Sequence, residues 1–349
     1  MQQALALSGD TPTVARGKAL EEAGRLAHDR GDPDQTEALH AAALAIWRAL
    51  ADPHGEARAL DELGNVAHDR GDFARAVAFH EQALALTRAA GDRRGTGRAL
   101  NNLGMVALYQ SQDERACQLY EEALAIMREI GDAFGANVVR NNLGIVAVRR
   151  GDIEQAAALA TACLEGCRAL GDEQGVGTAL FNLAEVAQLQ GDLERAAALY
   201  EEARQRLQEL GDDRAVAEVC SGLATLALLQ GDEARAAALV GTSLALAQTV
   251  DDQLKIAEAL EGVAAIAAHR GAAERAAHVL GAAAALRERI AAPVAGHHRA
   301  AYAQLVAATR AALEPAAFAT AWGMGQEWSL DQVVAEARAL TQAEVGPRS

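Results

Sequence analysis

This sequence has few aromatic residues and few cysteines. Aromatic side chains make up 3% of its 349 residues, whereas hydrophobic residues make up 51%, so we expect a core built mainly from Ala and Leu at short packing distances. The four cysteines are too few for the disulfide framework of a small secreted protein. A reducing, cytoplasmic location is the simplest interpretation.

Positive charge and long apolar runs are also scarce. The formal net charge is −16, which argues against the basic face that nucleic acid requires and against binding to anionic membrane surfaces. No run of about 18 residues is apolar throughout, so no membrane-spanning helix is predicted. Residues 1–20 lack the basic start of a signal peptide. We therefore predict partners that are proteins or peptides, with no nucleic acid and no membrane.

A Gly-Asp pair recurs along the chain every 40 residues, in two series that are offset by 20. Gly31-Asp32 and Gly71-Asp72 begin the first series, and Gly91-Asp92 and Gly131-Asp132 begin the second. Glycine can end a helix at positive φ, and the Asp side chain can cap the free N–H groups of the next helix. A fixed period in this range is typical of stacked helical hairpins.

Small and apolar residues follow a helical spacing between these pairs. In one repeat, Leu60, Gly64 and Ala67 fall on a single stripe of the first helix, which we call helix A. Glycine inside a helix costs about 1 kcal/mol against Ala. We therefore expect Gly64 and its equivalents Gly104 and Gly144 to lie close against the second helix of each hairpin, helix B.

This pattern, with Leu-Gly on helix A, Gly-Asp at the hairpin and Ala on helix B, resembles the tetratricopeptide repeat. The resemblance covers about residues 17–290 and implies an all-α fold, a right-handed α-solenoid of helical hairpins. We predict a repeat array over residues 1–290, with about seven hairpins of which the first is incomplete, and C-terminal capping helices over residues 291–349. Two units depart from the pattern, at Ser111-Gln112 and at Gly271-Ala272.

Both ends of the chain differ from the repeats. Residues 1–15 resemble the end of a helix B without its helix A, so we expect the chain to be part of a larger protein. After Pro293 the repeat pattern stops and apolar-periodic segments follow. The last of these covers residues 329–340, with Ser329 as its predicted N-cap.

Residues 274–340 are similar to the C-terminal end of large LuxR-type bacterial regulators and related signal-transducing ATPases. In those proteins a tetratricopeptide sensor array follows a nucleotide-binding module, so the resemblance implies a sensing or partner-binding role. This chain contains no G-x-x-x-x-G-K-[ST] loop for nucleotide phosphates and no basic recognition helix for DNA. We therefore expect the sensing part alone, without a cofactor.

In tetratricopeptide arrays helix A lines a concave groove, so the candidate binding residues are those that flank the Leu-Gly stripe. They are Arg58, Asn65, Arg98, Asn101, Asn102, Tyr109, Asn141, Asn142 and Asn182. The Asn-Asn pairs recur 40 residues apart, so their amides should stack one repeat apart and could grip the backbone of an extended peptide. Arg58 and Arg98 could hold a carboxylate. The alternative is that these Asn side chains only bond the backbone of the neighbouring repeat.

Histidine pairs offer a second kind of chemistry. His28 and His68 occupy equivalent positions and are each followed by Asp, so they could form a metal or pH-sensing pair. Partly exposed places near the helix ends are favoured instead, because a cation there suits the helix dipole. His40 and His80 are interpreted in the same way.

The cysteines and the search for catalytic motifs give little evidence of a chemical function. Cys163 and Cys167 are one helical turn apart and could chelate a soft metal, but the equivalent residues elsewhere are small or apolar, which favours core positions. No Ser-His-Asp set occurs at a recognisable spacing. We predict no metal site and no enzymatic activity.

The predicted function is a non-catalytic protein- or peptide-binding scaffold, the partner-binding or sensing part of a bacterial regulatory system. The alternative is a small-effector sensor coupled to a separate or missing nucleotide-binding module. Only the alternative predicts that a small molecule raises the melting temperature.

Overall fold

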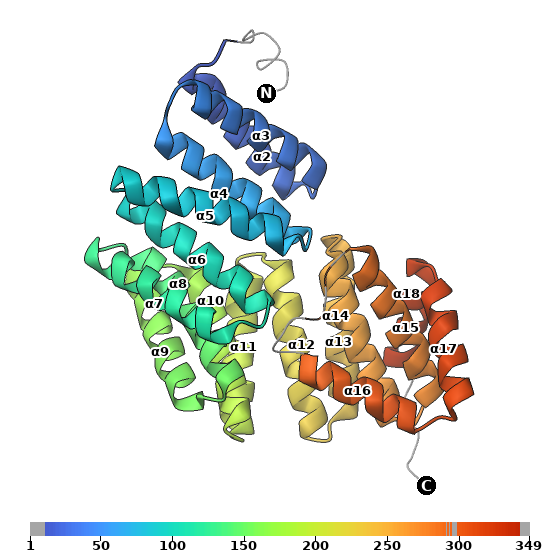
Figure 1. The fold of residues 1–349 in the computed structure, drawn as a ribbon. Coiled ribbons are helices and arrows are strands. Elements are labelled where there is room, and N and C mark those ends of the chain that lie inside the picture. The colour runs from blue at the N-terminus through green and yellow to red at the C-terminus, as the bar shows by residue number, and fades with distance from the viewer. Residues whose placement is uncertain (1–10, 291, 293, 295–298, 343–349) are drawn as a thin grey trace. The chain divides into compact units, whose positions relative to one another are not determined.

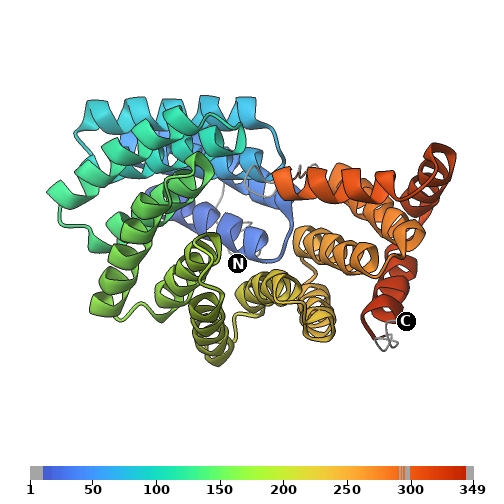
Figure 2. The ribbon, with the colours of Figure 1, turned by 90° about the horizontal axis from the view of Figure 1, so that it is seen from below.

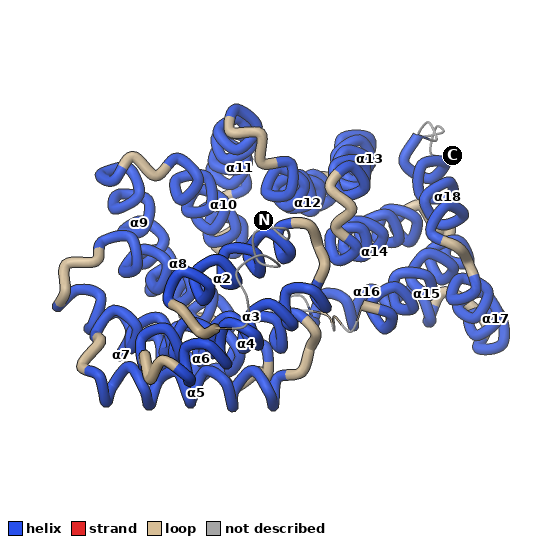
Figure 3. Tube along the Cα trace, turned by 90° about the horizontal axis from the view of Figure 1, so that it is seen from above, coloured by secondary structure: helices blue, strands red, loops and turns tan. Residues whose placement is uncertain are grey.

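The computed structural model describes residues 11–290, 292, 294 and 299–342, and every regular element in this part of the chain is an α-helix (Figure 3). The helices up to residue 289 have nearly constant length, and the last three, of 13 residues each, are shorter (Figure 1). Their bounds are α2 (Val14–Asp29), α3 (Pro33–Ala49), α4 (Pro53–Asp69), α5 (Phe73–Ala90), α6 (Arg93–Tyr109), α7 (Asp113–Glu129), α8 (Ala133–Arg150), α9 (Ile153–Leu170), α10 (Glu173–Leu189), α11 (Leu193–Glu209), α12 (Asp213–Leu229), α13 (Glu233–Thr249), α14 (Gln253–His269), α15 (Ala273–Arg289), α16 (Arg299–Ala311), α17 (Pro315–Glu327) and α18 (Leu330–Gln342).

The helices belong to two compact units, which we describe separately. The first unit ends at Val146 and the second begins at Ala147, so α8 crosses the division. In the first unit α2, α4 and α6 pair with α3, α5 and α7, and in the second α10, α12 and α14 pair with α11, α13 and α15. Within each unit, successive pairs pack side by side (Figure 2). This regular arrangement of hairpins confirms the predicted fold class. The predicted incomplete repeat at the N-terminus rests largely on residues 1–10, which lie outside the described residues.

The Gly-Asp pairs end one helix and start the next, as predicted. Gly71 has φ of 73°, a conformation that residues with a Cβ rarely adopt. The Asp72 side chain then accepts a hydrogen bond from the Arg75 N–H at 3.1 Å and caps α5. Where the pair is missing, the turn keeps its shape without the cap, because Ser111 still has φ of 60° but Gln112 makes no capping bond.

Glycine on helix A lies against a large side chain of helix B. A Cβ on Gly64 would meet the His80 ring, and a Cβ on Gly104 would lie 2.6 Å from Cε1 of Tyr120. Both observations confirm the expected close approach of the two helices. His80 is completely buried and His40 nearly so. The expectation that these two histidines lie at partly exposed helix ends was therefore wrong, because the Gly-to-ring contact places them inside the hairpin.

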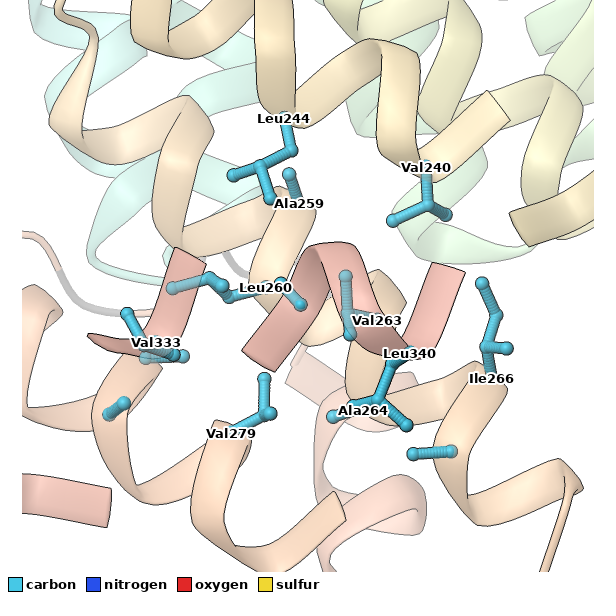
Figure 4. Close-up of a cluster of buried hydrophobic side chains, with 14 of the residues drawn as sticks. Val240, Leu244, Ala259, Leu260, Val263, Ala264, Ile266, Val279, Val333 and Leu340 are labelled. Atoms are coloured by element: carbon cyan, nitrogen blue, oxygen red, sulfur yellow. The ribbon is translucent and has the colours of Figure 1, made fainter. Parts of the chain in front are cut away.

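The last three helices pack on the last two repeats of the second unit. Val333 and Leu340 of α18 lie in one apolar cluster with Leu244, Val263 and Val279 from α13, α14 and α15 (Figure 4). Ion pairs lie near this contact, and one of them joins Arg275 to Glu336 at 2.5 Å.

The N-terminus of α18 has the predicted cap. The Gln332 N–H donates to Ser329 Oγ at 3.3 Å, and the Ser329 N–H donates to the Gln332 side chain at 2.8 Å. These reciprocal bonds form a capping box, which confirms Ser329 as the N-cap. None of the described helices combines the length and apolar character needed to cross a bilayer.

Candidate functional site

The nine predicted site residues all lie on helices A. Arg58 and Asn65 belong to α4, and Asn182 belongs to α10 in the second unit. The other residues are on α6 and α8 of the first unit: Arg98, Asn101, Asn102, Tyr109, Asn141 and Asn142.

Part of the predicted amide ladder forms between neighbouring repeats of the first unit. Nδ2 of Asn142 donates to Oδ1 of Asn101 at 2.9 Å, and Nδ2 of Asn101 lies 3.4 Å from Oδ1 of Asn102. The observed partner of Asn142 is a side-chain amide and not the neighbouring backbone. Asn102 is buried at 9% exposure, whereas Asn101 and Asn142 remain partly exposed. A primary amide has two donor hydrogens and an acceptor oxygen, so amides bonded in this way retain groups that can meet a ligand.

Each predicted groove arginine pairs with a carboxylate of the preceding repeat. Arg58 Nη2 lies 3.3 Å from Glu21 Oε1, and the same oxygen accepts from Trp47 Nε1 at 2.9 Å. Arg98 Nε donates to Asp61 Oδ2 at 2.9 Å. These bonds hold each guanidinium in place and use only part of its five N–H donors.

The remaining candidates of the first unit have neighbours of their own. Asn65 Nδ2 donates to Glu62 Oε2 at 3.3 Å on the same helix. The Tyr109 ring is 40% exposed and meets His68 edge-on, with 4.5 Å between ring centroids. Tyr109 therefore presents an aromatic surface to solvent at the C-terminal end of α6.

The predicted histidine pair shares one carboxylate. Asp69 accepts from His28 Nε2 and from His68 Nδ1, each at 3.3 Å. Burial opposes ionisation of Asp69, but the hydrogen bonds from His68 and His28 lower its pKa below the usual range. No group of three side chains suited to a metal ion occurs among the described residues.

The two cysteines that lie one turn apart on α9 are core residues. Cys163 and Cys167 are both buried, with their sulfur atoms 4.0 Å apart. Burial also raises the pKa of Cys220 to about 11, which makes that thiol a poor nucleophile. These positions fit the predicted role in packing.

Sequence reasoning missed a carboxylate on the helix A face of the second unit. Burial and, to a smaller extent, the charge of Glu218 on α12 together raise the pKa of Glu185 on α10 to about 7. Glu185 occupies the position of Asn65 three repeats later, so the repeat alignment could have placed it on this face. Its burial depends on packing between repeats, which the alignment does not contain.

Comparison with solved structures gives likeness of fold at low sequence identity. A Rap protein complexed with Competence and Sporulation Factor shares 14% identity over 98% of this chain and 99% of its own, with a TM-score of 0.60. Aspartyl phosphate phosphatase F from Bacillus subtilis shares 13% over 76% and 75%, with a TM-score of 0.52.

A third structure is a signal transduction ATPase with numerous domains from Pyrococcus horikoshii, which carries a tetratricopeptide repeat sensor. It shares 15% identity over 76% of this chain but only 40% of its own length, with a TM-score of 0.58. All these identities are too low to show more than the fold. No curated protein matches the sequence.

Sequence comparison with protein families identifies the repeats directly. The family model described as tetratricopeptide repeat matches five overlapping stretches, at residues 16–89, 57–129, 95–169, 135–209 and 175–249. Because these matches together cover more than half of its residues, the chain belongs to the tetratricopeptide repeat family.

Proposed function

We propose that this chain is the partner-binding part of a bacterial regulatory system, and that it holds a segment of another protein against the helix A face. Its tetratricopeptide fold is that of a protein-interaction scaffold, which supports this general role. We propose further that it acts in the cytoplasm and catalyses no reaction of its own.

The observation that carries the proposal is the amide contact between Asn101 and Asn142. Asn is a poor helix former and is rarely favoured at mid-helix positions. Here the amides of Asn101, Asn102 and Asn142 form a connected row across two repeats, and Asn101 and Asn142 remain partly exposed, which supports a role in binding peptide backbone. The fold likeness to a Rap protein solved with a bound factor is compatible with this role.

A pull-down with mass spectrometry tests the proposal. We expect the wild-type chain to capture a protein that the double variant Asn102→Ala, Asn142→Ala does not retain. Gln118→Ala is the matched control, because Gln118 is an exposed amide on helix B of the same unit. Equal capture by the double variant and the control would overturn the assignment of the groove.

The second candidate function is a sensor for a small effector that works with a separate nucleotide-binding module. The fold likeness to the sensor-bearing ATPase favours it. A thermal-shift screen of sugars, nucleotides and short peptides separates the two functions, because a ligand that binds the folded chain raises its melting temperature. A shift produced by a sugar or nucleotide would support the sensor, and shifts produced by peptides alone would support the scaffold.

A further inference from the structure

One stretch of the helix A face in the second unit combines negative charge with exposed leucine. We call it the α10/α12 face and define it by Glu185 and Leu189 on α10 and by Glu218 and Leu229 on α12. Glu185 and Leu189 are one turn apart, and Glu218 and Leu229 are three turns apart, so each pair lies on one side of its helix. The two helices belong to neighbouring repeats and contact each other (Figure 1).

Glu185 is the unpaired carboxylate of this face. Its side chain is partly buried, and no hydrogen bond or ion pair to it occurs among the described residues. A partly buried carboxylate without a partner is unfavourable, since it loses part of its hydration and gains no counter-charge in return.

Other carboxylates on helices A do have cationic partners. In the first unit Asp61 is paired with Arg98, and in the second Glu218 lies 3.4 Å from Lys255 Nζ. Glu261 is likewise paired with Arg287 at 2.6 Å. Glu185 therefore lacks a cation that comparable carboxylates receive from their own chain.

The apolar part of the face lies beside this carboxylate. Leu189 is 55% exposed and Leu229 is 60% exposed, although both occupy the last turn of a helix A. Neighbouring repeats thus present a leucine at the same position, and a partner that covers both removes apolar surface from water.

We propose that the α10/α12 face binds a segment of the partner protein in which an arginine or lysine lies next to apolar side chains. The cation pairs with Glu185, and the apolar side chains cover Leu189 and Leu229. The proposal rests on the proposed scaffold function and names the chemistry of its partner. The net charge of −16 suits such a basic segment.

Two short synthetic peptides provide the probe. Both carry leucines around one central position, which is arginine in the first peptide and the neutral isostere citrulline in the second. Fluorescence anisotropy measures their affinity for the full chain. We expect the arginine peptide to bind about tenfold more tightly, the change expected for one charge-assisted hydrogen bond.

Three variants decide whether the face is responsible. Glu185→Gln should abolish the preference for arginine, and Leu229→Asp should weaken binding of both peptides. Glu165→Gln, an exposed position on helix B of the same unit, should leave both affinities unchanged. Equal affinity of wild type for the two peptides, no binding of either, or an arginine preference that survives Glu185→Gln would each overturn the proposal.

Partner capture distinguishes failure of this inference from failure of the proposed function. If capture needs Asn102 and Asn142 but does not change in Glu185→Gln, the scaffold function stands and the cationic anchor is wrong. If capture changes in neither variant, the proposed groove itself fails.

Discussion

His80 Nδ1 lies 3.2 Å from Asp61 Oδ1 inside the hairpin of α4 and α5, and neither side chain reaches solvent. The other oxygen of Asp61 accepts from Arg98 Nε of the next repeat. One carboxylate therefore joins helix A, helix B and the following helix A in the first unit.

Removing this carboxylate should destabilise the first unit strongly. Asp61→Ala leaves the buried His80 ring and the Arg98 guanidinium without their shared acceptor. Removing a buried acceptor so that its donors are left unpaired costs about 1 to 3 kcal/mol, and more where a donor is charged. Urea unfolding followed by circular dichroism measures the loss as a lower midpoint.

Asp34→Ala is the matched control for that experiment. Asp34 also pairs with an arginine, Arg70, at 2.6 Å, but its side chain is 92% exposed. Exposed pairs contribute about 0 to 1 kcal/mol, so this variant should unfold close to wild type. Similar midpoints for Asp61→Ala and Asp34→Ala would show that burial of the carboxylate does not matter.

A methyl group on Gly104 should separate α6 from α7. The added Cβ would lie 2.6 Å from Cε1 of Tyr120, whose ring is completely buried and cannot move aside. We expect Gly104→Ala to lower the free energy of unfolding by about 2 kcal/mol, as for other overpacked cores. Gly323→Ala on α17 is the same chemical change at a site with no atom within 4 Å of the new Cβ, and should raise stability by up to about 1 kcal/mol. Calorimetry that gave both variants the same sign would contradict this packing argument.

A missing helix cap can be restored. Gln112 precedes α7 with φ of −95° and ψ of 62°, close to the −82° and 70° of the capping residue Asp72. Gln112→Asp should therefore accept a backbone N–H of the first turn and stabilise the chain by about 1 kcal/mol. Asp72→Ala is the reverse change, with a loss of similar size. If the urea midpoint of Gln112→Asp does not rise, geometry at this turn prevents capping.

The repeat fold could be read from the sequence because local chemistry repeats with it. Gly71-Asp72 ends and starts helices through its own backbone and side chain, and Gly104 requires a close neighbour whatever that neighbour is. The identity of the neighbour is not local, which is why His80 was placed wrongly. Its equivalent Tyr120 is just as buried, and this pair of bulky rings under Gly64 and Gly104 was the signal that could have corrected the expectation.

The candidate site was predicted less completely than the fold. The recurrence of the Asn-Asn pairs predicted that amides of neighbouring repeats lie together, and Asn142 does contact Asn101. The carboxylate partners of Arg58 and Arg98 were missed, although both pairs have the same separation of 37 residues. That spacing depends on which residues of one helix A face the next helix A, and the sequence of a single repeat does not show this. The partial burial of Glu185 depends in addition on how α10 and α12 pack. Amino-acid composition does not predict that packing.

Glu185 should make the stability of the second unit depend on pH. Burial and, to a smaller extent, the charge of Glu218 raise its pKa from 4.5 to about 7, and Tyr200 on α11 also interacts with it. At a pH between the unfolded pKa of 4.5 and the folded pKa of about 7, the folded chain binds more protons than the unfolded chain. The contribution of Glu185 to stability therefore falls as pH rises. The penalty is absent well below pH 4.5 and complete well above pH 7, where it reaches about 3 kcal/mol.

Glu185→Gln removes this titration and should therefore stabilise the chain at pH 8 but not at pH ~4, a pH below the unfolded pKa of Glu. Urea midpoints of wild type and variant at the two pH values measure the difference. Glu165→Gln is the control, because the carboxylate of Glu165 is exposed and its removal should change the midpoint equally little at both pH values. A Glu185→Gln midpoint that follows wild type at pH 8 would mean that the carboxylate is solvated. In that case it would have no unmet need for a cation, and the proposed arginine or lysine anchor would lose its physical basis.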